Sequence, residues 1–266
     1  MYRSIFRPDL FAGQTFIVTG GGSGIGRAVA HELGSLGGQI VLAGRKAENL
    51  AQVVAEVEQA GGTAVYTLCN IREEEQCAAL VRFALDKFGA VHGLVNNAGG
   101  QFPSPAEFIS RKGWHAVLET NLTGTFSMCQ QVFQQWMGQH GGVIINMVAE
   151  MWRGFPGMAH TGAARAAVVN LTMTLAVEWA KAGVRVNAVA PGTIEGSGLT
   201  KYDPSMKPFI ELVKQDMPYF RLGTESEVAA AVTFFALPSR RLYQRRNAQG
   251  GWGQFPMAQN MADRPA

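Results

Sequence analysis

Cysteine and histidine are scarce in this sequence, and neither is arranged as a metal site would need. The 266 residues include three cysteines, Cys69, Cys77 and Cys129, and no two of them form a C-x-x-C pair. The five histidines are scattered without the spacing of metal ligands. We therefore expect reduced, mostly buried thiols and no bound metal.

Long apolar runs and a charged leader are also missing. No apolar stretch reaches the roughly 20 residues that cross a bilayer, and no cationic segment followed by an apolar core marks a secretory signal. Together with the unpaired cysteines, these absences predict a cytoplasmic protein with no membrane partner.

Excess charge is missing too, once the C-terminal end is set aside. The formal net charge of +3 is more than accounted for by the five arginines and one aspartate that follow Leu237. The rest of the chain is close to neutral, and a near-neutral surface offers little attraction to a polyanion. We therefore expect no nucleic-acid partner.

The sequence does contain a regular alternation of apolar, β-branched runs with helical segments. The runs predict buried strands at Thr15–Gly20, Gln39–Gly44, Ala64–Asn70, Gly93–Gly99, Gly142–Val148 and Val184–Gly192. Helices are expected between them, at 26–36, 46–60, 73–88, 120–139 and 161–182. Such alternation predicts an α/β fold, a single-domain, doubly wound parallel sheet of Rossmann type covered on both faces. A further helix over Pro204–Met217 is expected in a flap beside the substrate site.

The turn after the first strand is rich in glycine. It reads TGGGSGIGRA over Thr19–Ala28, and its glycines are spaced G-x-x-x-G-x-G, which differs from G-x-G-x-x-G. At a strand-to-helix junction, backbone N–H groups and the helix dipole can hold a pyrophosphate. We assign cofactor binding to this loop, and a glycine-rich turn without a ligand is the alternative. The residues assigned are Gly20, Ser23, Gly24, Ile25 and Gly26.

This glycine spacing resembles that of the short-chain dehydrogenase/reductase family. The motifs NNAG (Asn96–Gly99), NLTGTF (Asn121–Phe126) and VNAVAPG (Val186–Gly192) follow in the family's order, and the resemblance extends over residues 13–237. It implies one nicotinamide-binding domain over this range, a small-molecule substrate and a homotetramer. It also implies that the cofactor contacts Asn70, Asn97, Ala98, Gly99, Arg165, Pro191, Gly192 and Ile194.

The end of the second strand bears on the choice between NAD and NADP. An acidic residue there would bind the ribose 2′-hydroxyl and repel a 2′-phosphate, but the sequence reads AGRK over Ala43–Lys46. Arg45 presents a planar fork that suits a phosphate, so we expect NADP. A solvated basic pair at a helix start is the alternative. Asn70 stands where many relatives carry an aspartate toward the adenine.

The family's usual catalytic set is Asn, Ser, Tyr and Lys, and this chain keeps only the asparagine. Asn121 matches that residue, whereas Val148 stands at the serine position, Thr161 at the tyrosine and Arg165 at the lysine. No tyrosine occurs between residues 67 and 201. A threonine hydroxyl is too weak an acid for a developing alkoxide. Carbonyl reduction by the family's usual route is therefore not expected.

Two segments resemble one branch of the family more closely. Residues 96–129 and 160–172 are similar to the peroxisomal trans-2-enoyl-CoA reductases and the related 2,4-dienoyl-CoA reductases. The resemblance implies NADPH-dependent reduction of the C=C bond of a 2-enoyl-CoA thioester, with Asn121, Thr161 and Arg165 as the catalytic residues. The alternatives are a dehydrogenase or reductase of another small alcohol or carbonyl compound, and a non-catalytic NADP-binding homologue.

Other side chains near the expected site are open to two interpretations. Glu150 is either an acid at the strand end or a solvated or helix-capping residue, and His160 is either a proton donor beside Thr161 or an ordinary packed or surface histidine. Tyr202, in the expected flap, is the one tyrosine placed to reach the site. The residues expected to line the pocket are Gln101, Phe102 and Trp152.

Residues 238–266 do not continue the α/β pattern, which makes the final strand of the sheet doubtful. The family has a seventh apolar strand here, and a buried strand does not accommodate Arg240, Arg241, Arg245 and Arg246. One back-translation of Leu237–Trp252, read one base later, gives CPAAAYISGATLRVDG, a typical ending for this family. We hypothesise a frameshift close to Leu237, in the gene or in its sequencing. A genuine divergent tail is the alternative.

Overall fold

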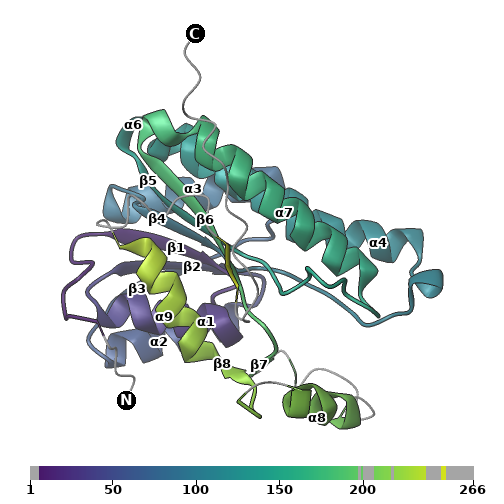
Figure 1. Cartoon of the computed structure of the whole chain (residues 1–266). Coiled ribbons are helices and arrows are strands. Elements are labelled where there is room, and N and C mark those ends of the chain that lie inside the picture. Colours follow the sequence, from purple (N-terminus) through teal and green to yellow (C-terminus); the bar gives the residue numbers. More distant parts are fainter. Residues whose placement is uncertain (1–5, 197–198, 200–206, 217–218, 238–246, 250–266) are drawn as a thin grey trace, which may run out of the picture.

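The structure, a computed structural model, describes residues 6–196, 199, 207–216, 219–237 and 247–249. Its centre is a seven-stranded sheet in the order β3-β2-β1-β4-β5-β6-β9 (Figure 1). Every neighbouring pair in this sheet is parallel. The strands are β1 Thr15–Thr19, β2 Gln39–Gly44, β3 Thr63–Leu68, β4 Gly93–Asn96, β5 Gly142–Met147, β6 Val184–Ala190 and β9 Asn247–Gln249.

The strand order turns at one place, between β1 and β4. From β1 the chain moves outward through β2 to β3, and it then returns to add β4, β5 and β6 on the other side of β1. In such a sheet, ligands bind outside the carboxyl ends of the strands at the point where the order reverses. The segments after β1, β4 and β5 therefore form the part of the molecule where a site is expected.

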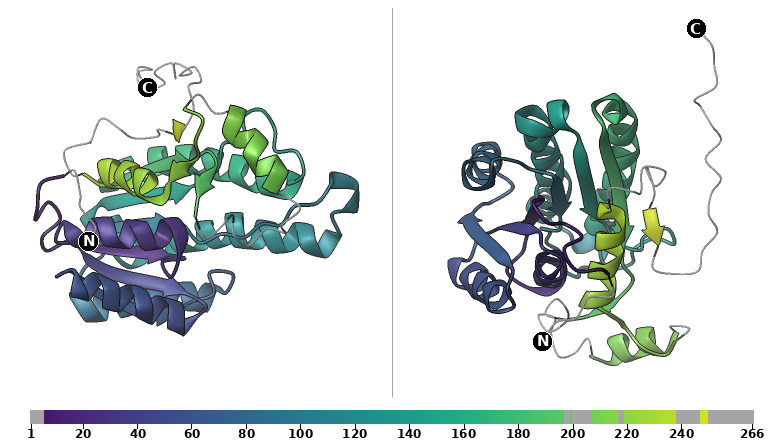
Figure 2. Two further views of the ribbon diagram at one scale, coloured as in Figure 1. Left: turned by 90° about the horizontal axis from the view of Figure 1, so that it is seen from below. Right: turned by 90° about the vertical axis from the view of Figure 1, so that its left-hand side faces the viewer.

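Helices cover both faces of the sheet (Figures 1 and 2). One face carries α1 Gly24–Ser35, α2 Ala47–Gln59 and α9 Glu225–Ala236, and α1 packs closely on α9. The other face carries α3 Glu74–Phe88, α5 Gly124–Val132 and α7 Ala159–Glu178. Each face has its own apolar core, with Val18, Leu33 and Phe235 in one and Ile17, Leu80 and Met128 in the other. The two cores confirm the predicted layers.

The helical region before β5 is longer and less regular than its sequence pattern suggested. The pattern predicts one helix over 120–139, but α4 begins it at Arg111 and ends at Leu118. The hydroxyl of Ser110 accepts a hydrogen bond from Gly113 N and so caps the start of α4. A π-helical turn over Glu119–Thr123 joins α4 to α5, and a second one over residues 133–137 joins α5 to α6 Gly138–His140. Turns of this kind are frequent at functional sites.

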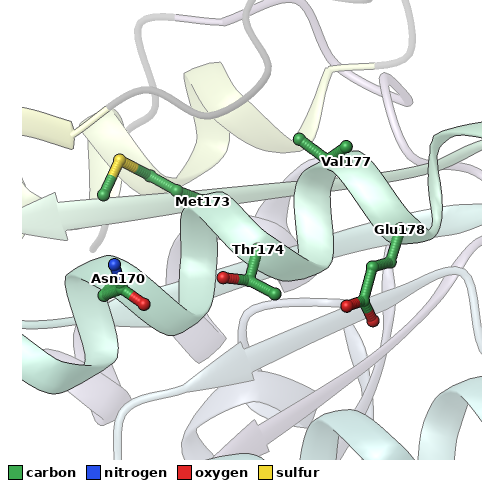
Figure 3. A pocket seen from close by; sticks show the side chains of 5 residues that line it. All are labelled: Asn170, Met173, Thr174, Val177 and Glu178. Carbon is green, nitrogen blue, oxygen red and sulfur yellow. The ribbon is translucent and has the colours of Figure 1, made fainter.

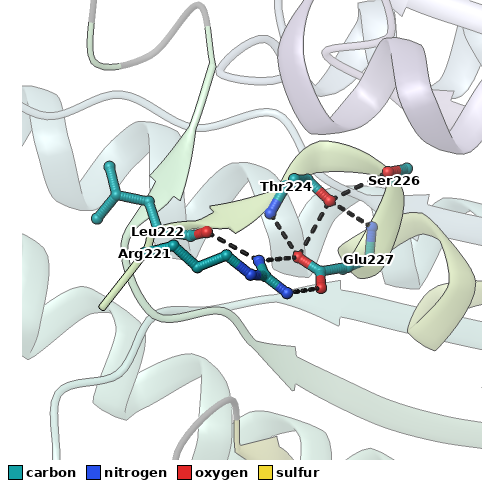
Figure 4. A network of polar contacts seen from close by, with 5 residues as sticks. All are labelled: Arg221, Leu222, Thr224, Ser226 and Glu227. Carbon is teal, nitrogen blue, oxygen red and sulfur yellow. Dashed lines mark hydrogen bonds and ion pairs between the residues drawn. The ribbon is translucent and has the colours of Figure 1, made fainter. Parts of the chain in front are cut away.

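A smaller unit lies beyond β6. The strands β7 Ile194–Glu195 and β8 Gly223–Thr224 pair with each other, and α8 covers residues Lys207–Asp216, which places a helix inside the range predicted for the flap. Thr224 and Glu227 form a reciprocal capping box at the start of α9. Arg221 adds two bonds to the Glu227 carboxylate, at 3.0 and 2.6 Å (Figure 4). The start of α9 is therefore held by four polar side chains, including Ser226.

The structure confirms the predicted α/β fold, and each of the six strands expected from the sequence is present. The doubtful seventh strand is present as three residues of β9, which pair with β6 from Ala188↔Asn247 to Ala190↔Gln249. All five arginines of the tail, and Tyr202, lie outside the described residues. All three cysteines are buried and free. No helix within the described ranges is long and apolar enough to span a membrane.

Candidate active site

The glycine loop after β1 folds directly onto the segment that follows β4. A Cβ atom on Gly26 would lie 2.5 Å from the side-chain nitrogen of Asn97 and would also overlap the carbonyl of Gly20. Gly20 itself has φ +66°, in the left-handed region that favours glycine. Larger residues at these two positions would push the loop away from the strand ends, so the spacing found in the sequence has a steric cause.

Thr19, the last residue of β1, organises this contact. Its hydroxyl accepts hydrogen bonds from the backbone N–H groups of Asn97 (3.1 Å) and Ala98 (3.0 Å). The Asn97 side chain donates in return to the carbonyls of Thr19 (3.0 Å) and Gly20 (3.2 Å). The place of Thr19 directly before the glycine loop is the one sequence signal for this role. These bonds fix the glycine loop against Ala98 and Gly99.

The N-terminus of α1 points at the same place and is chemically suited to an anion. Ser23 is the N-cap residue, and its side chain makes no capping bond to the helix. The first turn of α1, which includes Ile25, carries no acidic residue. The first turn therefore offers free N–H groups and the helix dipole without an acidic side chain of its own. The loop fits the pyrophosphate that the sequence predicts.

Basic and polar residues follow β2 and β3 beside this loop. Arg45 is exposed directly after β2, and Lys46 is the N-cap residue of α2. Asn70 follows β3, where its side chain donates to Glu73 (3.3 Å) and accepts from the backbone N–H of Arg72 (3.4 Å). Asn70 thus closes the turn before α3, a structural contribution that the sequence analysis did not foresee. Arg45 is free to meet a ligand from solvent.

Arg165 reaches from α7 to the ends of two central strands. Its Nη1 atom donates to the carbonyl of Met147, the last residue of β5, over 2.6 Å. A Cβ on Gly99 would overlap Nη2 of Arg165 and lie 2.8 Å from Oδ1 of Asn121. Burial lowers the pKa of the Arg165 guanidinium to about 10, which still leaves it charged at neutral pH. No carboxylate of the described residues pairs with it.

Asn121 holds the segment after β4 and lies in the π-helical turn. Its side-chain nitrogen donates to the carbonyls of Gly100 (2.6 Å) and Val117 (2.9 Å), which uses both amide hydrogens. Its oxygen accepts from the backbone N–H of Gly100 (3.3 Å). Asn121 therefore positions the Gly99–Gly100 backbone beside Arg165, and its amide has no hydrogen left to donate to a substrate.

Thr161 and His160 lie at the start of α7, and both are fully buried. The backbone N–H of Thr161 donates to Nδ1 of His160 over 2.9 Å, and the Thr161 hydroxyl lies 3.4 Å from the same atom. Thr161 and Arg165 are four residues apart, so they share one face of the helix. Val148, at the family's serine position, is buried and apolar. The described side chains around Thr161 thus provide no tyrosine or serine hydroxyl.

Two loops close over this end of the sheet. Ser104, in the loop after β4, donates from its backbone N–H to the carbonyl of Gly157 in the loop after β5, over 2.7 Å. Phe102 packs edge-on against His160, with ring centroids 4.4 Å apart. Trp152 is partly exposed in the second loop, and Glu150 bonds through its backbone N–H to the carbonyl of Pro191. The residues expected to line a pocket therefore belong to two connected loops.

The remaining residues considered from the sequence lie on or after other strands of the sheet. Pro191 and Gly192 follow β6, and Ile194 opens β7, so they lie on the far side of β5 from the glycine loop. Tyr66 lies on the edge strand β3, with β2, β1 and β4 between it and β5. Tyr219 is exposed, six residues before α9 begins. The edge position keeps Tyr66 away from Thr161.

A separate shallow hollow runs along the outer side of α7 (Figure 3). It is lined by Asn170, Met173, Thr174, Val177 and Glu178, which all come from this one helix. These residues lie more than two helical turns beyond Thr161. The hollow is therefore not part of the candidate active site, which the residues after β1, β4 and β5 form together.

Comparisons with known proteins agree with this geometry. A family model described as short chain dehydrogenase matches residues 14–207. A probable 2,4-dienoyl-CoA reductase [(2E)-enoyl-CoA-producing] of Bacillus subtilis (strain 168) is 38% identical over 224 residues, which cover 83% of this chain and 88% of the relative.

Solved structures agree as well. A citronellol catabolism dehydrogenase of Pseudomonas aeruginosa PAO1 has a TM-score of 0.84 and 50% identity over 93% of this chain and 97% of that one. A variant of actinorhodin polyketide ketoreductase, solved with NADPH, has a TM-score of 0.84 and 28% identity over 91% of this chain and 98% of its own. With the sheet order, the glycine loop and the family model in agreement, the chain belongs to the short-chain dehydrogenase family and is an oxidoreductase.

Proposed function

We propose that this protein reduces the C=C bond of a 2-enoyl-CoA thioester with NADPH. The observation that carries the proposal is Arg165, a buried cation at the ends of β4 and β5 with no carboxylate partner among the described residues. A buried positive charge favours a reaction that places negative charge beside it. The described side chains around it include no tyrosine hydroxyl to protonate an alkoxide.

The residues after β1 and β2 fit an NADP cofactor. Gly20 and Gly26 let the loop pack closely against Asn97 and Ala98, and the first turn of α1 offers N–H groups without an acid. Arg45 follows β2 where an acid would select NAD. When bound, NADPH supplies a hydride, that is, one hydrogen with two electrons. Arg165 and the backbone at Gly99 are placed to hold the nicotinamide end.

The chain's own residues suit an electrophilic role. As the hydride bonds to the β-carbon of the thioester, the C=C electron pair moves toward the carbonyl oxygen, which becomes an enolate. Arg165 provides a permanent positive charge for that oxygen, and the Thr161 hydroxyl is a weak donor beside it. A proton from water then bonds to the α-carbon and restores the carbonyl. No side chain has to give up a proton.

Reduction of a ketone would demand more than these residues offer. An alkoxide must be protonated as it forms, and a lysine-assisted tyrosine is the family's donor for that step. Thr161 is far too weak an acid, and Arg165 stays charged at neutral pH. Relatives named 2,4-dienoyl-CoA reductase, including one from Danio rerio that is 37% identical, support the thioester as the substrate.

The test is NADPH oxidation with a panel of trans-2-enoyl-CoA thioesters. We expect turnover with NADPH, a saturated acyl-CoA as product, and a large loss in the Arg165→Met variant. Removal of a group that stabilises an oxyanion costs about 10²- to 10³-fold in rate. Arg165→Lys should keep part of the activity because it keeps the charge. Tight NADPH binding without turnover of any enoyl-CoA would contradict the proposal and favour a non-catalytic homologue.

A second candidate is a dehydrogenase acting on a branched terpenoid alcohol. The specific observation in its favour is the 50% identity to the citronellol catabolism dehydrogenase. Oxidation of citronellol with NADP⁺, at a rate above that of any enoyl-CoA reduction, would support this candidate. The threonine at the family's tyrosine position argues against it, because a lysine-assisted tyrosine is the family's usual acid–base group.

The outer side of α7 supports the further proposal of a homotetramer. Val177 is 55% exposed there, next to Asn170 and Thr174 in the hollow of Figure 3. Exposed apolar side chains along a long helix are typical of a face that another subunit covers. Light scattering should give four times the mass of the 28.6 kDa chain. A monomer would contradict this proposal.

A further inference from the structure

The hydrogen bonds of His160 indicate which of its two ring nitrogens carries the hydrogen. The backbone N–H of Thr161 donates to its Nδ1 atom over 2.9 Å and shares its hydrogen with the carbonyl of Met158 at 3.0 Å. A backbone N–H group can only donate, so Nδ1 is the acceptor. A neutral imidazole carries one hydrogen, which must then be on Nε2. His160 therefore presents an N–H donor at Nε2.

This donor has no acceptor. Nε2 of His160 is buried and has no hydrogen-bond partner in the part of the chain that the structure describes. The whole side chain is 0% exposed. Leaving a buried donor unpaired lowers the stability of a protein, and such groups call for a functional explanation. A ligand that brings an oxygen atom would complete the bond.

The surroundings of His160 identify the kind of ligand. His160 adjoins Thr161, which stands where the family has its catalytic tyrosine, and Phe102 from the loop after β4 packs against its ring. The 20-residue helix α7 begins one residue earlier and has no acid in its first turn. The helix dipole therefore adds positive potential at this point. An oxygen that becomes negative during a reaction fits both features.

We propose that the Nε2–H group of His160 is a catalytic hydrogen-bond donor to the thioester carbonyl oxygen of the substrate. This inference rests on the proposed function. The hydride brings two electrons to the β-carbon, the displaced pair collects on the carbonyl oxygen, and the His160 donor stabilises that charge. The hydrogen stays on Nε2 throughout, and the α-carbon takes its proton from water. His160 thus fills the place of the missing tyrosine as a donor, without being an acid.

The test compares three variants of one enzyme. His160→Leu removes the donor at similar volume, and we expect kcat/KM for a trans-2-enoyl-CoA to fall about 100-fold or more. His160→Gln keeps a side-chain N–H and should retain at least ten times more activity than the leucine variant. NADPH affinity should stay within about twofold in both. The thermal midpoint of His160→Leu should equal or exceed that of the wild type, because an unpaired buried donor is gone.

A matched control is available at the opposite end of the sheet. His92 also accepts a backbone N–H at Nδ1, from Thr15 over 3.0 Å, and lies before the start of β4. His92→Leu should lower the thermal midpoint and leave kcat/KM unchanged within about twofold. If His160→Leu behaves like this control, with a lower midpoint and unchanged kcat/KM, His160 is structural and the inference is overturned.

A binding measurement separates this inference from the proposed function. The imidazole signals of ¹⁵N-histidine-labelled protein should shift at Nε2 of His160 when octanoyl-CoA and NADP⁺ are added. If the wild type reduces no enoyl-CoA but this signal shifts, the proposed reaction is wrong and the donor site stands. If the wild type turns over and the signal does not move, the reaction stands and the His160 inference is overturned. If the wild type shows no turnover and the signal does not shift, both the proposed reaction and the His160 inference are overturned.

Discussion

Arg165 donates a hydrogen bond to the main-chain carbonyl of Met147 over 2.6 Å. This bond ties α7 to the end of β5 and aims a buried cation at the space above β4 and β5. A lysine at this position would offer one compact ammonium group, whereas the guanidinium keeps further N–H groups after bonding to Met147. The arrangement explains how the chain can lose the family's tyrosine and still hold a charge for the reaction.

The glycine loop gives a direct prediction for cofactor binding. Gly26→Ala would place a methyl group against Asn97 and Gly20, so NADPH should bind at least about 10-fold more weakly, or ~1.4 kcal/mol. Fluorescence titration of NADPH measures the change. Gly34→Ala, in the same helix but beside Val57, should leave the affinity unchanged. Equal affinities in all three proteins would show that the loop does not hold the cofactor.

Arg45 should decide the choice of cofactor. Arg45→Ala removes the planar charged group after β2, and NADPH should bind about 10- to 100-fold more weakly, since a charged hydrogen bond contributes about 1.5–3 kcal/mol. NADH affinity should be unchanged. Steady-state kinetics with both cofactors test this, with Arg72→Ala as an exposed control outside the loop. An equal loss for both cofactors would mean that Arg45 does not contact the 2′-phosphate.

Because of Glu56, the free energy of unfolding should depend on pH. The bond from Arg27 (2.6 Å) and the bonds from His31 and Gln52 lower the pKa of Glu56 from 4.5 to about 2. The stabilisation is therefore present above pH 4.5 and disappears as the pH falls toward 2. Glu56→Gln should lower the free energy of unfolding by about 1 kcal/mol at pH 7.

Urea unfolding at two pH values measures this effect. The difference between wild type and Glu56→Gln should shrink when the pH is lowered from 7 to 3. The exposed Glu58 lies on the same helix and serves as control, since Glu58→Gln should change stability little at either pH. A difference that stays constant with pH would rule out the carboxylate as its source.

The sequence of the C-terminal end should affect both thermal stability and oligomeric state. In the alternative reading frame, the residues T-L-R fall on positions 247–249, where the structure has β9 paired with β6. Replacing Leu237–Trp252 by CPAAAYISGATLRVDG should therefore lengthen an apolar edge strand, raise the thermal midpoint and favour the tetramer. Calorimetry and light scattering measure both. An unchanged midpoint and mass would favour a genuine divergent tail.

The sequence predicted most of the fold because each central strand is apolar on both faces. An apolar run such as Gln39–Gly44 is stable as a strand only in a sheet whose two faces are both covered. The start of α4 was missed because the segment around Ser110 is polar and the helix is interrupted by a π-helical turn. The spacing of Thr161 and Arg165 placed them on one face, but their neighbours come from elsewhere in the chain.

Contacts between distant segments are the part that the sequence could not provide. Nothing in the local pattern indicates that Arg165 meets the carbonyl of Met147, or that both amide hydrogens of Asn121 are used by Gly100 and Val117. The sequence around His160 fits two roles, and only the buried Nε2 atom without a described partner distinguishes between them. Such facts depend on the packing of loops after β4 and β5.

The most direct test of C=C reduction without a tyrosine is an isotope measurement on the product. The enzyme is supplied with NADPH and a trans-2-enoyl-CoA in D₂O, and the acyl-CoA is analysed by mass spectrometry and NMR. We expect a saturated thioester with one deuterium on the α-carbon, from solvent, and none on the β-carbon, which receives its hydrogen from NADPH. A product reduced at the carbonyl, or no product from enzyme that binds NADPH, would contradict it.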